Sequence, residues 1–422
     1  MIARKEFNPP TAPAGSRIRT VIGPVHPALK EPIKFLFEIE GETVVDVDFA
    51  PGHAHRGIEW MGMRRNCVQI IHTAERICGI CGVSHSLSYC RAVEQAAGIE
   101  VPPRADYLRT IYGELERIHS HLLWAGVAAL ELGFDTLFYK AWEVRENVMD
   151  LLEYLSGNRV NYGTLQVGGM RRDIEPAQHE RIFESMDYYT GLFDDLLEMF
   201  LDDSVMKTRC RDTGVLSRGD AMRLCTVGPT IRASGIPTDV RQDHPYCAYG
   251  DLDFKAVTPE ALGGEVHGDV YDRIIVRLLE VKAATQIIRE CIDKMPDGPI
   301  NAFKKLFLLL NHVKKAEGEG VGRHEAPRGE VFHYVKLAKN KEEAEAWKVK
   351  ASTYSNLMSW QTMLKGQQIA DIPIVVASVD PCISCTDRVA LIGDGKTSIL
   401  TNEQLRRLSR RKTEALRSGG AP

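Results

Sequence analysis

Two pairs of cysteines with the same two-residue spacing stand near opposite ends of the chain. Cys78 and Cys81 lie in AERICGICGVSH, and Cys382 and Cys385 lie in SVDPCISCTDR. Two thiolates at this spacing can bind one metal ion, because the intervening turn lets both sulfur atoms converge. One such pair is a moderate indication of a metal site, whereas two pairs are a strong one.

The cysteine pairs could hold structural zinc, carry out thioredoxin-like redox chemistry or form one buried functional metal site. Structural zinc modules usually bring their pairs together within about 15–20 residues, but most of this chain lies between its pairs. A chain of 422 residues also needs no local staple to bury a core. Thioredoxin-like redox chemistry is less favoured, because neither pair opens a helix in a βαβ setting. We therefore prefer one buried site built from both pairs, with soft ligands that suit iron, nickel, copper or zinc.

Basic residues near the motifs fit a thiolate-rich site. Burying several negative charges requires compensation. Arg76 precedes the first pair, Arg388 follows the second, and Arg328 stands in EAPRGE before a strand. A single arginine is usually a surface charge, but three beside these motifs favour charge compensation. The other six cysteines stand alone, and we interpret them as small buried hydrophobic residues: Cys67, Cys90, Cys210, Cys225, Cys247 and Cys291.

The composition excludes several classes of protein. The chain is 44% hydrophobic and 26% charged with a net charge of −4, which excludes a disordered protein and argues against a nucleic-acid binder. The first residues contain no apolar signal core, and no apolar run reaches the ~20 residues of a spanning helix. We expect a soluble or peripheral chain without a transmembrane segment.

The elements that must position the cysteines are mainly helical. Apolar spacing predicts four long helices, packed as a bundle, within residues 104–133, 136–157, 176–203 and 268–295. A hairpin is expected at 35–49, with its turn at Gly41 and Glu42, and strands are expected at 329–337 and 372–379. Residues 389–400 read as two short strands around an Asp-Gly turn. Thr401 is expected to cap a basic helix that frays after Ser418.

These elements predict a mainly α (α+β) fold, a long-helix bundle with small β-elements from both ends of the chain. We expect a single domain. Its parts would be an N-terminal β-region (1–56), the helical bundle (57–320), C-terminal strands with the second cysteine pair (321–400) and a basic tail (401–422).

The motifs resemble those of the large, catalytic subunit of [NiFe]-hydrogenases, and within that family the membrane-bound energy-converting group. The resemblance spans essentially the whole chain and rests on RICGIC, DPCISCTDR, GPVHP, ELERIHSHLL, SGNRVNYG, GGMRRDI and EAPRGE. Several blocks also resemble the 49-kilodalton-type subunit of respiratory NADH:quinone oxidoreductase. That relative lacks the four cysteines, so their presence favours the hydrogenase.

The resemblance implies a nickel–iron centre whose iron carries carbon monoxide and cyanide. By position, Cys78 and Cys382 would be terminal nickel ligands, and Cys81 and Cys385 would bridge the two metals. Splitting dihydrogen needs a base, and a terminal thiolate such as that of Cys382 can take the proton. Arg328 would lie over the open coordination position.

The resemblance also assigns supporting roles. Thr353, or its neighbour Ser352, would hydrogen-bond a cyanide, and Asp380 would anchor Arg328. Glu31 occupies the place of a proposed proton-gating glutamate. Lesser candidates for the proton route are His26, Glu59, His72 and Asp387.

Two departures from the family pattern concern magnesium and maturation. In standard members, the residue at Glu59 helps to bind magnesium together with a histidine, but that histidine position is Arg388 here. The guanidinium charge can replace the ion, so the family's magnesium site does not carry over directly. Many members are also trimmed just after the second pair. Residues 389–422 are then either removed or retained, and the expected hairpin and helix favour retention.

The implied complex contains an iron–sulfur small subunit, membrane ion-translocating subunits and ferredoxin or another low-potential electron donor. It would reduce protons to dihydrogen, or run the reverse reaction, on the cytoplasmic side of the cell membrane. Three rivals remain: a related complex that reduces sulfur compounds or quinone, a scaffold that holds structural zinc, and an electron-relay subunit.

Overall fold

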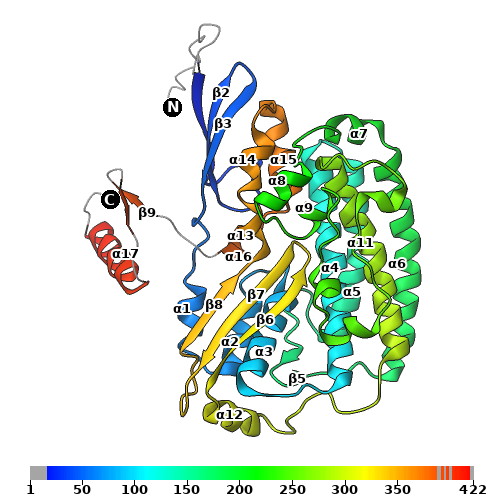
Figure 1. Cartoon of the computed structure of the whole chain (residues 1–422), viewed down its shortest axis with the longest axis vertical. Helices are drawn as coiled ribbons and strands as arrows, with labels where there is room; N and C mark the ends of the chain where they lie inside the picture. Colours follow the sequence, from blue (N-terminus) through cyan, green and yellow to red (C-terminus); the bar gives the residue numbers. More distant parts are fainter. Residues whose placement is uncertain (1–16, 387–390, 394–395, 399–401, 419–422) are drawn as a thin grey trace.

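The structure, a computed structural model, describes residues 17–386, 391–393, 396–398 and 402–418. Figure 1 shows the long helices side by side on one flank, a three-stranded sheet next to them and an N-terminal sheet at one end. This mainly helical architecture with small antiparallel sheets confirms the predicted fold class. No helix in the described ranges has the length and apolar character needed to cross a bilayer.

Four long helices form the bundle, as their apolar spacing predicts. Helix α4 (Pro103–Glu131) lies at its centre and packs against α5 (Asp135–Ser156) and α11 (Val270–Lys294), while α6 (Pro176–Asp202) packs on α5. Prolines begin α4 and α6, where the missing N–H costs no hydrogen bond. Helix α5 ends at Gly157, which adopts a left-handed conformation with φ 81°.

The N-terminal sheet is antiparallel, in the order β1 (Arg17–Ile22), β2 (Lys34–Glu40) and β3 (Thr43–Ala50). Phe35, Phe37 and Ile39 alternate with more exposed residues and face the core. The predicted hairpin is therefore confirmed. The loop between β1 and β2 carries Lys30 and Glu31 toward the second cysteine pair and the bundle.

The second sheet, in the order β6 (Gly318–Ala326), β7 (Gly329–Leu337) and β8 (Ala346–Lys350), packs on helix α3 (Gly82–Ala97). Three alternate glycines of β6 allow this close approach. A Cβ atom on Gly322 would lie 1.9 Å from the carbonyl oxygen of Ser88, and Gly318 and Gly320 are similarly close to the α3 backbone. The glycines thereby hold the strand that leads to Arg328 directly against the helix that begins at the first cysteine pair.

Replacement of Gly322 by alanine should therefore destabilise the chain. The added methyl group meets backbone rather than a movable side chain, so we expect a loss of about 3 kcal/mol in the free energy of unfolding. Gly191→Ala, on a helical glycine whose Cβ would meet no atom within 4 Å, is the matched control and should be neutral or slightly stabilising. Chemical denaturation of the full chain measures both. Equal stability of the two variants would contradict this packing.

The strand predicted for residues 372–379 is wrong. Helix α15 (Ile372–Ser378) occupies this segment, with Pro373 in its first turn. Its β-branched side chains are buried almost all round, against α4, α11 and α14 (Ser359–Leu364). Burial on every side removes the periodicity that would distinguish a buried helix from a buried strand, so packing decides the conformation.

Short helices also surround the second cysteine pair, namely α13 (Ser352–Asn356) and α16 (Ile383–Thr386). Strands β9 (Leu391–Gly393) and β10 (Lys396–Ser398) pair antiparallel as predicted. Their Asp-Gly turn, the expected cap Thr401 and the chain after Ser418 lie outside the described residues. Helix α17 (Asn402–Arg417) forms the basic tail.

The remaining elements are short and connect these parts. They are α1 (Ile58–Gly62), α2 (Cys67–Glu75), β4 (Leu165–Gln166), β5 (Gly169–Met170), α7 (Ser204–Cys210), α8 (Arg218–Arg223), α9 (Pro229–Arg232), α10 (Val240–Asp243), α12 (Leu306–Lys315) and three 3-10 turns at Cys247–Asp251, Pro259–Leu262 and Ile369–Asp371.

Candidate metal centre

The two cysteine pairs meet in one buried cluster. The sulfur atoms of Cys78, Cys81, Cys382 and Cys385 all lie within 4.8 Å of one another. The Cys382 sulfur is 3.2 Å from that of Cys78 and 2.8 Å from that of Cys385, and none of the four forms a disulfide. Four buried sulfur atoms at such distances can serve as ligands of one metal centre.

The electrostatics of the cluster favour a bound cation. Hydrogen bonds from Cys382 and the other two thiols hold the pKa of Cys78 well below its ordinary value. Burial raises the pKa of Cys385 well above it. Repeated ionisation in a buried cluster is opposed by desolvation and by like charge. A positive ion among the sulfurs would release the remaining protons, so this donor set fits a soft metal centre.

Hydrogen bonds hold both cysteine loops in place. Cys81 immediately precedes α3, and Glu116 accepts hydrogen bonds from the backbone N–H groups of the first turn, including that of Ser84 at 2.9 Å. Arg56 donates to the carbonyl oxygens of Arg76 (3.1 Å) and Ser384 (3.2 Å), and so ties the first loop to the second. These hydrogen bonds orient the two loops that carry the cysteines.

The side chains expected to serve the second pair do lie beside it. The backbone N–H of Cys382 donates to the Thr353 hydroxyl at 3.1 Å, and Ser352 is buried next to it. Glu31 accepts a hydrogen bond from the Ser384 backbone N–H at 3.1 Å and a further one from the Ser384 hydroxyl. Burial raises the pKa of Glu31, so its carboxyl group keeps a proton to higher pH than an exposed glutamate does.

Arg328 stands in the turn between β6 and β7 and is anchored by Asp380. Its Nε donates to the Asp380 carbonyl oxygen at 2.8 Å, and Nη2 donates to the Asp380 carboxylate at 3.1 Å. Burial opposes the charge of Arg328, but Asp380 and the nearby cysteines hold its pKa well above the ordinary value. The backbone of Gly228 packs so closely that a Cβ there would lie 2.5 Å from the Arg328 carbonyl group. Arg328 is therefore a fixed positive charge at the cluster.

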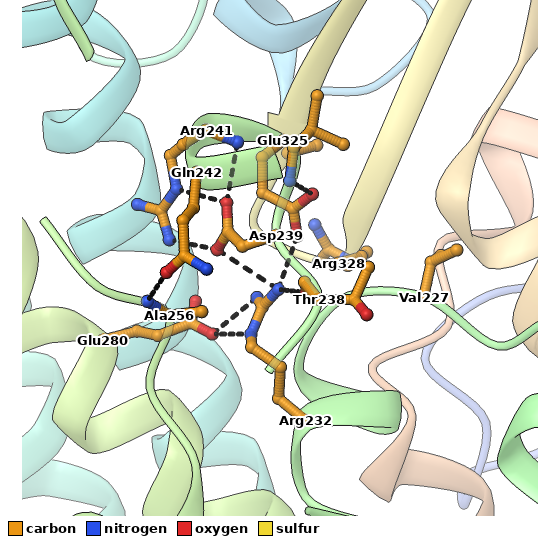
Figure 2. Close-up of polar contacts among 12 residues, drawn as sticks. Val227, Arg232, Thr238, Asp239, Arg241, Gln242, Ala256, Glu280, Glu325 and Arg328 are labelled. Carbon is orange, nitrogen blue, oxygen red and sulfur yellow. Dashed lines mark hydrogen bonds and ion pairs between the residues drawn. The ribbon is translucent and has the colours of Figure 1, made fainter. Parts of the chain in front are cut away.

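A network of buried ion pairs lies behind Arg328, and Figure 2 shows how its members face one another. Arg232 pairs with Glu280 at 2.6 Å and with Glu325 at 2.9 Å. Arg241 pairs with Asp239 at 2.7 Å. These contacts join α9, α10 and α11 to the end of β6. They fix the turn that carries Arg328, and loss of one partner in such a network is strongly destabilising.

A directional chain of hydrogen bonds ends on the cluster. The Trp347 indole N–H donates to His333 Nδ1 at 3.1 Å, which places the proton of neutral His333 on Nε2. That nitrogen lies 3.0 Å from His85 Nδ1, so His85 in turn carries its proton on Nε2, 3.4 Å from the Cys385 sulfur. Burial lowers the pKa of His85 to about 4, which keeps it neutral. His85 therefore donates a hydrogen bond to Cys385.

Other residues expected near the centre lie elsewhere. The Arg76 side chain is 56% exposed and pairs with Glu75, so it does not compensate the thiolates. Glu59 accepts a hydrogen bond from the Lys348 ammonium group at 2.8 Å. Among the described residues, it belongs to no group of side chains that could hold a metal ion. His26 and His72 are exposed. Asp387 and Arg388 lie outside the described residues.

Sequence reasoning missed Glu116, His85, His333 and Arg56. His85 follows Cys81 by one helical turn, so the spacing within ICGVSH was an available signal. His333 and Arg56 reach the site only through long-range packing. Their sequence neighbourhoods give no comparable indication.

The comparisons with known proteins agree with this geometry. Residues 56–126 match the family of nickel-dependent hydrogenases, and residues 131–388 match the 49-kilodalton subunit family of respiratory-chain NADH dehydrogenase. The alpha subunit of a membrane-bound hydrogenase of Pyrococcus furiosus is 46% identical over 401 residues, which is 94% of each chain. The chain belongs to this family of hydrogenase large subunits and 49-kilodalton respiratory subunits.

Two further similar proteins are a second hydrogenase and a subunit of a sulfane sulfur reductase. A carbon monoxide-induced hydrogenase of Rhodospirillum rubrum is 38% identical over 87% of this chain and 98% of its own length. A subunit in the solved structure of the membrane-bound sulfane sulfur reductase, an archaeal respiratory membrane complex, superposes with a TM-score of 0.81. It is 28% identical and covers 88% of this chain and 98% of its own length. Two of these relatives, the Pyrococcus furiosus hydrogenase subunit and the sulfane sulfur reductase, are named as membrane-bound.

Proposed function

We propose that this chain is the catalytic subunit of a membrane-associated [NiFe]-hydrogenase complex, which reduces protons to dihydrogen with low-potential electrons or runs the reverse reaction. The observation that carries the proposal is the buried cluster of four cysteine sulfurs, two from each pair. The 46% identity to a membrane-bound hydrogenase subunit supports it.

The residues of the chain would hold and assist a nickel–iron centre with carbon monoxide and cyanide on its iron. When bound, this centre supplies the metal that splits or forms dihydrogen. Cys78 and Cys382 would be the terminal ligands, and Cys81 and Cys385 the bridging ones. The Thr353 hydroxyl accepts a hydrogen bond from the Cys382 N–H. Its own proton would be available for a cyanide nitrogen, with Ser352 as the neighbouring candidate.

Arg328 would place its positive charge where dihydrogen is polarised, in an orientation fixed by Asp380. The thiolate of Cys382 would take or give the proton, and Glu31 would pass it on toward solvent. The raised pKa of Glu31 suits this step, because burial lets its carboxyl group hold a proton to higher pH than an exposed glutamate does, so that it can both accept and release one.

Replacement of Glu31 by glutamine should slow proton delivery and leave the metal in place. Glutamine keeps the size of the side chain and can still hydrogen-bond around Ser384, but it carries no transferable proton. We expect dihydrogen–deuterium exchange to fall by about 100-fold, with unchanged nickel content. Exchange at the wild-type rate in Glu31→Gln would remove this residue from the proton route.

The proposed complex places the chain at the cytoplasmic face of the cell membrane, bound to membrane subunits that move ions. Electrons from ferredoxin or another low-potential donor would arrive through an iron–sulfur cluster in a small partner subunit. The relatives' membership of membrane-bound complexes supports this setting. Magnesium is left out of the proposal, because Glu59 is paired with Lys348.

Elemental analysis of the purified native complex tests the proposal. We expect one nickel per copy of this chain, together with iron. Stoichiometric zinc without nickel, despite nickel in the growth medium, would contradict it and favour a zinc scaffold. Reduction of sulfur compounds is the second candidate function, favoured by the structural similarity to the sulfane sulfur reductase. Dihydrogen–deuterium exchange by the native complex separates the two, because only a hydrogenase catalyses it.

A further inference from the structure

Buried polar atoms without a hydrogen-bond partner occur on Lys30 and Arg277, which both lie against Trp124 of α4, and on Asp380, whose charge acts on both of them. Lys30 Nζ, two guanidinium nitrogens of Arg277 and the second carboxylate oxygen of Asp380 are buried, and none has a partner among the described residues. The Lys30 ammonium lies 5.9 Å and the Arg277 guanidinium 4.1 Å from the centre of the Trp124 ring. Buried polar groups are nearly always hydrogen-bonded, so ordered water is expected between these three side chains.

Lys30 can change its protonation near neutral pH. Burial lowers its pKa to about 8, with Asp380 and Glu131 opposing the shift and Arg328 and Arg277 adding to it. These groups face Lys30 from four other parts of the fold, and Glu31 follows it on its own loop. In its neutral form the amine can accept a hydrogen bond as well as donate one, so it can join a chain of water molecules in either direction.

Glu131 provides the outer end of this line. It stands about two helical turns beyond Trp124 on the same face of α4. Its side chain is partly buried, and burial raises its pKa while the charge of Lys30 opposes the rise. The charges of Asp380, which anchors Arg328, and of Glu131, at the end of α4, therefore both act on Lys30.

We propose that Lys30 is a proton-relay residue, which passes protons through ordered water between the region of Asp380 and Glu131 as a second route beside Glu31. In each passage the Lys30 amine takes one proton from water on one side, and the ammonium releases one proton to water on the other. No bond between heavy atoms changes, and no oxidant or reductant is required. The ion pair between Asp380 and Arg328 is kept throughout. This inference rests on the proposed hydrogenase function.

A titration tests the lysine without any metal. In the full chain labelled with 13C-lysine, we expect the resonance of one lysine side chain to titrate with a midpoint near pH 8. This resonance should be absent from Lys30→Arg. A midpoint for Lys30 close to the ordinary lysine value of about 10.4 would overturn the inference. Because the titration needs no nickel, it distinguishes failure of the relay from failure of the proposed function.

Exchange kinetics of the nickel-loaded complex test the relay itself. Lys30→Met removes charge and proton, whereas Lys30→Arg keeps the charge but holds its proton at every working pH. We expect both variants to lower dihydrogen–deuterium exchange by about tenfold with unchanged nickel content. Lys365→Met, on an exposed lysine paired with Asp46, is the matched control and should have no effect. Wild-type exchange in Lys30→Arg would show that only the charge matters and would overturn the relay.

A double variant tests the connection to Glu131. If both residues lie on one route, Glu131→Gln should slow exchange about as much as Lys30→Met, and the double variant should be no slower than either single one. Multiplied effects would contradict a shared route. A change of the pH profile on the alkaline side in Lys30→Met, absent from Lys365→Met, would further support proton transfer by the lysine over a purely structural role.

Discussion

Arg328→Lys should lower dihydrogen–deuterium exchange by about 100- to 1,000-fold while nickel remains bound. Lysine keeps a positive charge, but it cannot reproduce the two hydrogen bonds that the guanidinium donates to Asp380, at 2.8 and 3.1 Å. A charge that is no longer held at the cluster loses most of its value for stabilising a transition state. Exchange assays and nickel analysis on the same preparation measure the effect.

The companion variant Arg328→Met separates function from stability. It leaves Asp380 buried and unpaired, so we expect a loss of about 3–5 kcal/mol in the free energy of unfolding. Asp380→Asn added to Arg328→Met should restore part of this stability without restoring exchange. Arg76→Lys, on the exposed arginine beside the first pair, is the control and should retain full exchange. Normal exchange in Arg328→Lys would contradict the role assigned to Arg328.

Cys382→Ser should abolish nickel binding and exchange together. The Cys382 sulfur lies 3.2 Å from that of Cys78 and 2.8 Å from that of Cys385, so it belongs to both halves of the cluster. A serine hydroxyl is a hard ligand that stays protonated at neutral pH, and a soft metal binds it poorly. Metal analysis of the purified variant should therefore show nickel reduced to the background level.

The matched control is Cys225→Ser, because Cys225 is a free cysteine outside the cluster and is exposed, contrary to the expectation that it is buried. Its nickel content should equal that of the native chain. Cys78→Ser should behave like Cys382→Ser, since the two pairs contribute to one centre. Full nickel in Cys382→Ser, with loss only in Cys78→Ser, would mean that the pairs serve separate sites.

Much of the fold was predictable because its signals are local. The apolar spacing of residues 104–133 predicts α4, and glycine and proline mark the ends of α5 and α6. The hairpin of β2 and β3 follows from alternation around Gly41. Helix α15 was mistaken for a strand, because a short β-branched segment buried on every side has no readable period.

The candidate site was predictable where residue type and spacing carry the chemistry. The repeated cysteine spacing indicated one centre, and the four sulfurs do converge. Arg76 does not compensate the charge of the thiolates as expected, because proximity in sequence does not fix where a side chain lies. Its guanidinium group is exposed. The ion-pair network of Arg232 and the hydrogen bond from His333 to His85 depend on contacts between distant segments, which no local pattern encodes.

Dihydrogen–deuterium exchange by the purified native complex, assayed with nickel counted in the same sample, tests the central claim most directly. We expect one nickel per copy of this chain and formation of HD from D2 and water at a rate that follows the nickel content. A nickel-free complex, or one that contains nickel but forms no HD while it reduces sulfur compounds, would contradict it.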